Sequence, residues 1–271
     1  MGYATLDAAL AFPQNLPPNN AHIAIMDTLK ADANFLIHHF IVNQLKGNRN
    51  IVLVGLAQIF NHYFLIGRKL GINLQTFKQS GKLVFIDGLT HLNEYTTETP
   101  YPSSKAPTAP TDTLDFKMNS SSNDEILKSF YKKIADYVRK QPNTLLILDD
   151  ISVLLYNGFS LDQVLTFILK LRSLVENSQG TLVTIMHADE EGSEDNDEQD
   201  NFIKQILYGS HLILQVQPLH SGLARDVHGQ IDIIYGPQLD CFVKQNTPHH
   251  SMHYKILDNN VHFFAKGFLA P

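Results

Sequence analysis

The amino-acid sequence predicts an α/β protein with a mostly parallel, twisted sheet flanked by helices. Two observations support this class. Through residue 187 of the 271-residue chain, short apolar runs alternate with segments of helical periodicity, at a spacing that suits right-handed strand–helix–strand crossovers. Beyond residue 208 the apolar runs follow one another with turn residues between them. That pattern predicts antiparallel strands added at the C-terminal edge of the same sheet.

The first part of the chain contains three of the expected strands. They are the apolar runs HIAIMD at residues 22–27, NIVLVGL at 50–56 and KLVFID at 82–87. Between them, apolar side chains recur at helical spacing in residues 35–47 and 59–70, which predicts two helices. Asn34 is suited to cap the first helix, whose last turn reaches a glycine.

The alternation resumes after residue 122. An amphipathic pattern predicts a helix over residues 124–140, and TLLILDDI predicts a strand over 144–151. By the same patterns, a helix at 160–177 and a strand at 181–187 follow, and then a short helix at 202–208. Alternating or continuous apolar runs predict the last four strands, at 211–219, 230–236, 252–258 and 261–267.

These elements predict one domain over residues 22–271, preceded by a proline-bounded leader at 1–21. Residues 94–122 are rich in Thr, Ser and Pro without a hydrophobic period, so we expect a flexible insertion. Residues 189–200 (DEEGSEDNDEQD) hold eight acids and no base, which predicts a mobile, solvated surface loop. We expect it to tolerate deletion.

Charge and composition exclude several classes of protein. The chain has 21 Lys and Arg against 27 Asp and Glu, a net charge of -6, which excludes a uniformly basic nucleic-acid or membrane binder. Outside the acidic run 27 - 8 = 19 acids face 21 bases, so the folded body is nearly neutral. No apolar run approaches the ~20 residues of a membrane span. With Cys241 as the single cysteine, an intracellular location is expected.

Asp149 and Asp150 stand at the end of an apolar strand, the position from which an aspartate helps to hold Mg²⁺ in P-loop NTPases. The matching phosphate loop, GxxxxGK[ST], should follow the first strand. Residues 27–34 read DTLKADAN there, with no glycine and no Gly-Lys-Ser/Thr. We therefore expect the two aspartates to end their strand and cap the following turn rather than to bind metal.

The segment after the first strand is interpreted as a degenerate P-loop position at Asp27, Thr28 and Lys30. Lys30 can reach an anion. Without glycine, however, the backbone does not easily form a phosphate nest, and Asp27 and Asp32 would repel phosphate. We expect this chain alone to bind no nucleotide and no other cofactor.

The 13 histidines do not predict a strong metal site. His38 and His39 are neighbours on a helix and diverge by ~100°, so they cannot chelate one ion together. His249, His250 and His253 follow a proline in an expected loop and could hold a metal only loosely. The expectation is a solvated polar loop and no bound metal.

Two short stretches are candidate protein interfaces. Residues 60–64 (FNHYF) place aromatic side chains around a polar pair just after a strand, where open α/β sheets bind ligands. Residues 225–230 (RDVHGQ) form a turn with a cation, an acid and an imidazole, which suits either an interface or a self-neutralising hairpin. The candidate residues are Phe60, His62, Tyr63, Arg225, Asp226 and His228.

Taken in order, six segments resemble the sixth subunits of Elongator, the complex that modifies the wobble uridine of tRNA. They are FLIHHF at 35–40, GLAQIFNHYFLIGRKLG at 55–71, LILDDISVLL at 146–155, GSHLIL at 209–214, GLARDVHGQ at 222–230 and YKILDNNVHFFAKG at 254–267. The likeness spans residues 35–267 apart from the insertion, so no single short motif has to carry it.

The resemblance implies a RecA-like fold without a working phosphate loop. It also implies a non-catalytic subunit of a heterohexameric ring, with two copies each of this chain and the fourth and fifth subunits. Such a ring binds tRNA, assists the catalytic subcomplex in modifying U34, and occurs in cytoplasm and nucleus. RecA-like rings contact nucleic acid through loops that here correspond to residues 156–158 and to the acidic run, whose carboxylates oppose a phosphate backbone.

Two other functions remain open at this point. An autonomous RecA-type ATPase would need the missing Gly-Lys-Ser/Thr. A small metal-dependent hydrolase would have to combine Asp149 and Asp150 with the loop histidines, and the expected geometry is against this.

Overall fold

The computed structural model describes residues 2–92, 123–188, 197–222, 224–238 and 250–267. Nine strands form one sheet in the order β3-β2-β4-β5-β1-β6-β7-β8-β9. The first six strands in that order are parallel, and β7, β8 and β9 continue the sheet in antiparallel fashion. The predicted fold class is therefore confirmed. The strands are β1 Ala21–Asp27, β2 Ile51–Gly55, β3 Leu83–Asp87, β4 Leu145–Asp149, β5 Thr181–His187, β6 Leu212–Gln217, β7 Gly229–Tyr235, β8 His250–Ile256 and β9 Val261–Ala265.

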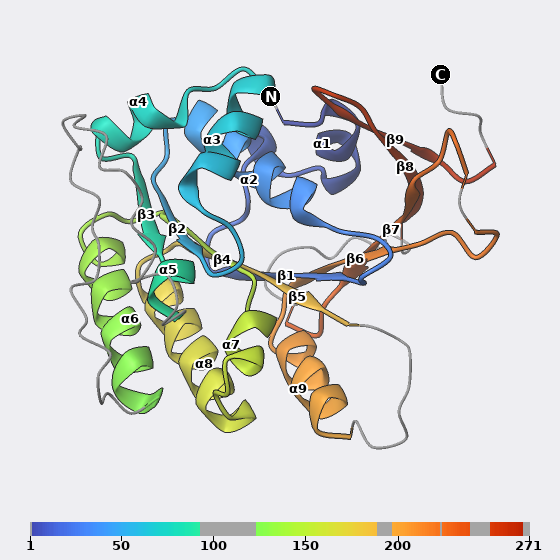
Figure 1. The fold of residues 1–271 in the computed structure, drawn as a ribbon. Helices are drawn as coiled ribbons and strands as arrows, with labels where there is room; N and C mark the ends of the chain where they lie inside the picture. The colour runs from blue at the N-terminus through green and yellow to red at the C-terminus, as the bar shows by residue number, and fades with distance from the viewer. Residues whose placement is uncertain (1, 93–122, 189–196, 223, 239–249, 268–271) are drawn as a thin grey trace, which may run out of the picture.

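Helices cover both faces of this sheet (Figure 1). Helices α1 to α4 lie on one face and α6 to α9 on the other, and each layer closes its own apolar core against the sheet. The central strands are therefore buried along their whole length, as their unbroken apolar sequences predict. The helices are α1 Ala4–Leu10, the 3-10 turn η1 Pro13–Asn15, α2 Asn34–Lys46, α3 Phe60–Lys69, α4 Leu74–Gln79, α5 Leu89–Leu92, α6 Asn123–Val138, α7 Ser152–Tyr156, α8 Leu161–Asn177 and α9 Asp197–Tyr208.

The parallel strands bring polar residues together at one edge of the sheet. Strand β1 lies between β5 and β6, with Asp27 in register with His187. Strand β4 lies between β2 and β5, and it ends at Asp149, beside Gly55 of β2. Because parallel strands end at the same edge, the segments that follow β1, β2, β4 and β5 form one surface.

Residues 1–21 were expected to be only a leader before the domain, and the structure corrects this. Helix α1 packs Leu6, which is fully buried, into the core, and the backbone N–H of Tyr3 donates to Nδ1 of His39 over 3.0 Å. The side chain of Asn43 donates to Oδ1 of Asp7 over 2.6 Å. Residues 2–10 are therefore an integral part of the α2 layer.

Other differences concern short or polar segments. The acidic run was expected as a loop over residues 189–200, but its last four residues form the first turn of α9, where negative charge stabilises a helix N-terminus. Residues 189–196 and the insertion at 94–122 lie outside the described residues. Helices α4 and α7 were not predicted. Within the described ranges, no helix is long and apolar enough to cross a membrane.

Candidate functional site

The loop between β1 and α2 occupies the position of a phosphate-binding loop, and the protein's own carboxylates fill it. The N–H of Ala33 donates to Oδ2 of Asp27 over 2.8 Å, and the N–H of Asn34 donates to Oδ1 of Asp32 over 2.6 Å. Asn34, expected to cap α2, is instead its first residue, and its side-chain amide donates to Oδ2 of Asp32. Two backbone donors that a bound phosphate would use are thus committed to carboxylates.

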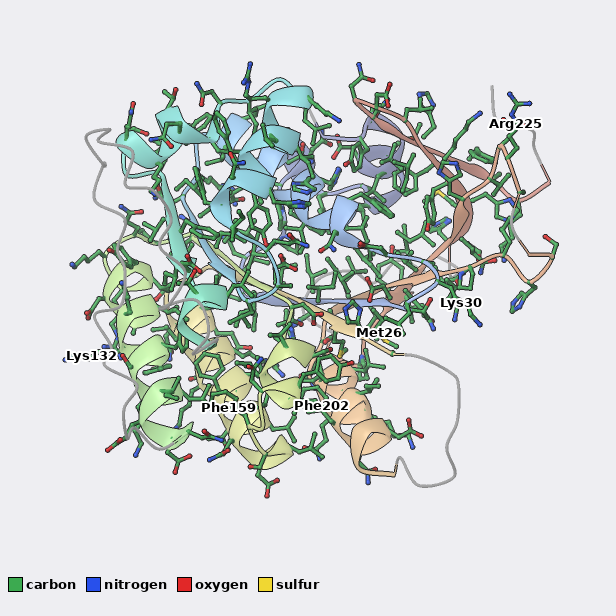
Figure 2. All side chains as sticks on the ribbon, in the orientation of Figure 1. Met26, Lys30, Lys132, Phe159, Phe202 and Arg225 are labelled. Atoms are coloured by element: carbon green, nitrogen blue, oxygen red, sulfur yellow. The ribbon has the colours of Figure 1, made fainter. Side chains whose placement is uncertain are left out.

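The rest of this loop is a tight turn. Thr28 and Ala31 form two backbone hydrogen bonds of 3.4 and 3.0 Å, which close the loop upon itself. Lys30 is exposed on the outer side of the turn (Figure 2). The degenerate P-loop position predicted at Asp27, Thr28 and Lys30 therefore folds as a short turn without a positive-φ residue.

A buried ion-pair network holds the carboxyl ends of β1, β4 and β5 together. Nδ1 of His187 contacts Oδ1 of Asp27, and Nε2 lies 2.8 Å from Oδ2 of Asp150. Contacts with Asp150 and Asp27 raise the pKa of His187 to about 11, so the imidazole is positively charged at neutral pH. Asp27 and Asp150 are 1% and 2% exposed, which leaves their charges little access to water.

Asp149 is largely protonated at neutral pH. Burial and the nearby Asp150 charge raise the pKa of Asp149 to about 8, and its Oδ2 accepts a hydrogen bond from the hydroxyl of Tyr63. A protonated carboxyl is a poor ligand for Mg²⁺. Among the described residues no group of three or more His, Cys, Asp or Glu side chains is placed to hold a metal ion.

Asp150 has a structural role that the sequence predicted. Its Oδ1 accepts a hydrogen bond from the N–H of Ser152 over 2.8 Å, so it caps the turn that opens α7. The Oγ of Ser152 in turn accepts from the backbone N–H of His187 over 2.9 Å. These contacts fix the β4–α7 connection against the end of β5.

The structure divides the first set of interface candidates. Tyr63, expected to be accessible, is 1% exposed and donates to Asp149, so it is corrected to a core residue. Phe60 is partly buried against Phe85, and the ammonium of Lys78 lies 4.8 Å from the centre of its ring. His62 is half-buried and its ring centre lies 5.6 Å from that of His38. Phe60 and His62 thus remain partly accessible to a partner.

The second set of candidates lies on the β6–β7 connection. Arg225, Asp226 and His228 are exposed, and Figure 2 shows Arg225 on the side of the molecule formed by β7, β8 and β9. Asp226 pairs with Lys255 over 2.7 Å, and the N–H of Ile256 donates to Nδ1 of His228 over 3.1 Å. The acid of this turn is thus neutralised by strand β8 rather than by Arg225.

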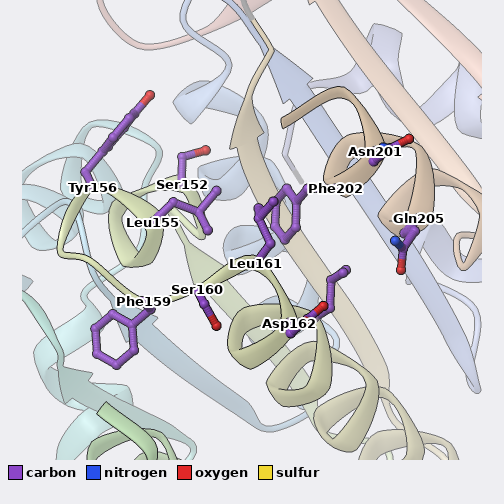
Figure 3. A pocket seen from close by; sticks show the side chains of 11 residues that line it. Ser152, Leu155, Tyr156, Phe159, Ser160, Leu161, Asp162, Asn201, Phe202 and Gln205 are labelled. Atoms are coloured by element: carbon purple, nitrogen blue, oxygen red, sulfur yellow. The ribbon is translucent and has the colours of Figure 1, made fainter. Parts of the chain in front are cut away.

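The candidate loop at residues 156–158 borders a hollow of about 640 Å³ between the start of α8 and α9. Figure 3 shows Phe202 and Leu161 facing this hollow and Tyr156 turned outward. Tyr156 is 70% exposed at the end of α7. An exposed tyrosine can stack on an unpaired base, but Asp162 on the rim would oppose a phosphate.

His249, His250 and His253 were expected to lie in one loop, and the structure corrects this for two of them. His250 and His253 belong to β8, three positions apart, so they point to opposite faces. His249 lies outside the described residues. His38 and His39 diverge as predicted: His38 contacts His62, whereas His39 stacks on Tyr3 with ring centres 5.5 Å apart.

Sequence reasoning missed the contact of His187 with Asp27 and Asp150. The signal was available, because residues 27, 149, 150 and 187 all stand at the ends of predicted parallel strands. The role of Tyr63 carried no such signal, since Tyr63 lies within helix α3 and not at the end of a strand.

Known proteins place the chain in a family. The family model for Elongation complex protein 6 matches residues 3–258. Elongator complex protein 6 of Rattus norvegicus is 33% identical over 256 residues, with 90% of each chain covered. The protein of the same name from Xenopus laevis is 35% identical, with 88% of each chain covered. The one from Homo sapiens is 31% identical, with 93% of this chain and 94% of the human chain covered. A KaiC-like protein of Pyrococcus horikoshii OT3 has a similar fold, with a TM-score of 0.58, 11% identity and coverage of 91% of this chain and 90% of the other.

Proposed function

The chain belongs to the Elongation complex protein 6 family, and from this premise we propose that it is a non-catalytic subunit of a RecA-like ring within Elongator. Its partners would be the fourth and fifth subunits, two copies of each of the three forming a hexamer. The ring would bind tRNA and assist the catalytic subcomplex in modifying wobble uridine, in cytoplasm and nucleus. The resemblance to the family supports these finer statements.

One observation supports the non-catalytic part of the proposal. The backbone donors at the start of α2, where a P-loop enzyme would hold phosphate, are bonded to Asp27 and Asp32. A triphosphate would have to displace two carboxylates and lie against their negative charge. Asp149, which would have to hold Mg²⁺, shares a hydrogen bond with Tyr63 in the core.

We therefore expect no saturable heat when Mg-ATP is titrated into the isolated chain by calorimetry, and no phosphate release above background. Asp149→Asn is the matched variant, because asparagine keeps an acceptor for the hydroxyl of Tyr63. An autonomous ATPase would instead show micromolar affinity that this variant abolishes. Hydrolysis by the assembled ring alone would place the catalytic sites in the partners or in composite sites between subunits.

The acidic run is proposed to have no required contact with RNA. Replacing residues 189–196 by a short Gly/Ser linker keeps the first turn of α9, which begins at Asp197. The sequence removed holds no base, so the assembled ring should bind tRNA equally or slightly more tightly, most visibly at low salt. The measurement is a tRNA titration at two ionic strengths. A large loss of affinity would show that the run makes a needed contact.

A further inference from the structure

Apolar side chains are exposed along both sides of a groove that crosses the start of α2. The groove encloses about 410 Å³ between α3 and the β8–β9 turn, with Asn34 and His38 of α2 on its floor. We call it the α3–β8 groove. Figure 1 shows α3 and the hairpin of β8 and β9 on the same face of the sheet as α2.

Exposed large apolar side chains lie in the groove and on the neighbouring helix α3. Ile59 and Leu65 are each 50% exposed at and along α3, and Ile256 and Leu257 are 41% and 42% exposed at the turn. Ile256 and Leu257 line the groove itself, and Ile59 follows the lining residue Gln58 in the chain. Leu65 is three residues after His62 and four before Lys69, which line the groove, so all three share one face of α3. Exposed apolar side chains gathered in this way mark protein interfaces rather than ordinary surface.

The charges inside the groove favour a cation. Asp32 and Asp258 line it, and the carboxylate oxygens of Asp32 accept hydrogen bonds from the backbone N–H and the side-chain amide of Asn34. Burial lowers the pKa of His38 to about 3 and also lowers the pKa of His62, so these two imidazoles are neutral at pH 7. Lys69 is the one cation among the lining residues, which leaves the groove net negative.

From this geometry we propose that the α3–β8 groove is a docking site for a segment of a partner ring subunit that carries an arginine or lysine between apolar side chains. The apolar neighbours would cover Leu65 and Leu257, and the cation would lie between Asp32 and Asp258. The amides of Asn34, Gln58 and Asn259 supply further acceptors along the groove, which suits the five donors of a guanidinium. Nucleic acid is disfavoured, because its phosphates would meet the carboxylates.

The inference rests on the proposed assembly, so the test uses this chain co-expressed with the fourth and fifth Elongator subunits. Native mass spectrometry measures the fraction of complete rings. A binding titration at two salt concentrations measures the affinity of this chain for the other two subunits. The rim variant is Leu65→Glu with Leu257→Glu. The charge variant is Asp32→Asn with Asp258→Asn, in which asparagine at position 32 keeps the acceptor for the N–H of Asn34. The control is Leu169→Glu, 59% exposed on α8 on the opposite face of the sheet.

We expect both groove variants to weaken assembly by about tenfold or more, and the charge variant also to lose part of the salt dependence. The control should assemble as the wild type does. Unchanged assembly in both groove variants, with a wild-type ring that forms, would overturn the docking site and leave the proposed function intact. Loss only in the rim variant would overturn the cationic contact. Failure of the wild type to assemble would overturn both proposals. Circular dichroism and urea unfolding check that each variant is folded.

Discussion

Replacing His187 with glutamine should lower the free energy of unfolding by about 3–5 kcal/mol at neutral pH. The imidazolium lies between the carboxylates of Asp27 and Asp150, which are almost completely buried. Glutamine keeps the approximate size of the side chain but supplies no charge. The two buried carboxylates would then lose their positively charged partner. Urea unfolding monitored by circular dichroism measures the loss.

The triple variant His187→Gln, Asp27→Asn, Asp150→Asn is the matched control. Asparagine still accepts from the N–H groups of Ala33 and Ser152, so the turns after β1 and β4 keep their hydrogen bonds. We expect this neutral network to recover most of the lost stability. A loss below about 1 kcal/mol in the single variant would mean that the contacts act like a surface ion pair and contribute little.

The same network has a defined pH dependence. The pKa of His187 is about 11 in the folded protein and near its ordinary 6.5 when unfolded, so its stabilisation is complete below pH 6.5 and disappears as the pH rises toward 11. The difference between wild type and His187→Gln should therefore shrink when the pH is raised from about 7 to about 10.

The parallel strands were predictable from the sequence because most of their positions are apolar. The alternation of apolar and polar residues in β7 likewise indicated a strand. Strand β5 has the bounds predicted for it, 181–187, and the other strands agree to within two residues at most ends. Helix α1 was missed because its sequence, ATLDAAL, is short and lies between glycine and proline. Its helix is stabilised by packing of Leu6 and by contacts with α2, which no local pattern contains.

The candidate site was only partly predictable, for a physical reason. The missing glycines of the loop after β1 are a local property of the sequence, and this loop contains no positive-φ residue in the structure. Asp27 and Asp32 accept hydrogen bonds from the backbone N–H groups at the start of α2. These bonds depend on the geometry of the turn, which the sequence leaves open. The groove beside α3 required the β8–β9 turn, about 200 residues later in the chain, to come beside α2.

Buried neutral histidines should make the protein sensitive to mild acid. Burial lowers the pKa values of His22, His38 and His39 to about 3. Below pH 6.5 the unfolded chain binds protons at these residues and the folded protein does not, so stability falls as the pH drops from 6.5 toward 3. Each histidine contributes about 1.4 kcal/mol per pH unit in this window. Asp149 acts in the opposite direction, because its raised pKa makes the folded protein more stable as the pH falls from about 8. It therefore offsets the contribution of about one of the three histidines.

His38→Phe isolates one of these contributions. Phenylalanine can keep the ring contacts with His62 and Tyr63 but cannot bind a proton. Between about pH 7 and about pH 5 the variant should therefore gain about 2 kcal/mol relative to the wild type, measured from urea unfolding at both pH values. His220→Phe, at an exposed position, is the control and should follow the wild type. If His38→Phe loses stability with acid as steeply as the wild type, the folded protein must admit a proton at His38. In that case the imidazole would be charged in the groove, where it would compete with the cation of a docked partner for the carboxylates of Asp32 and Asp258.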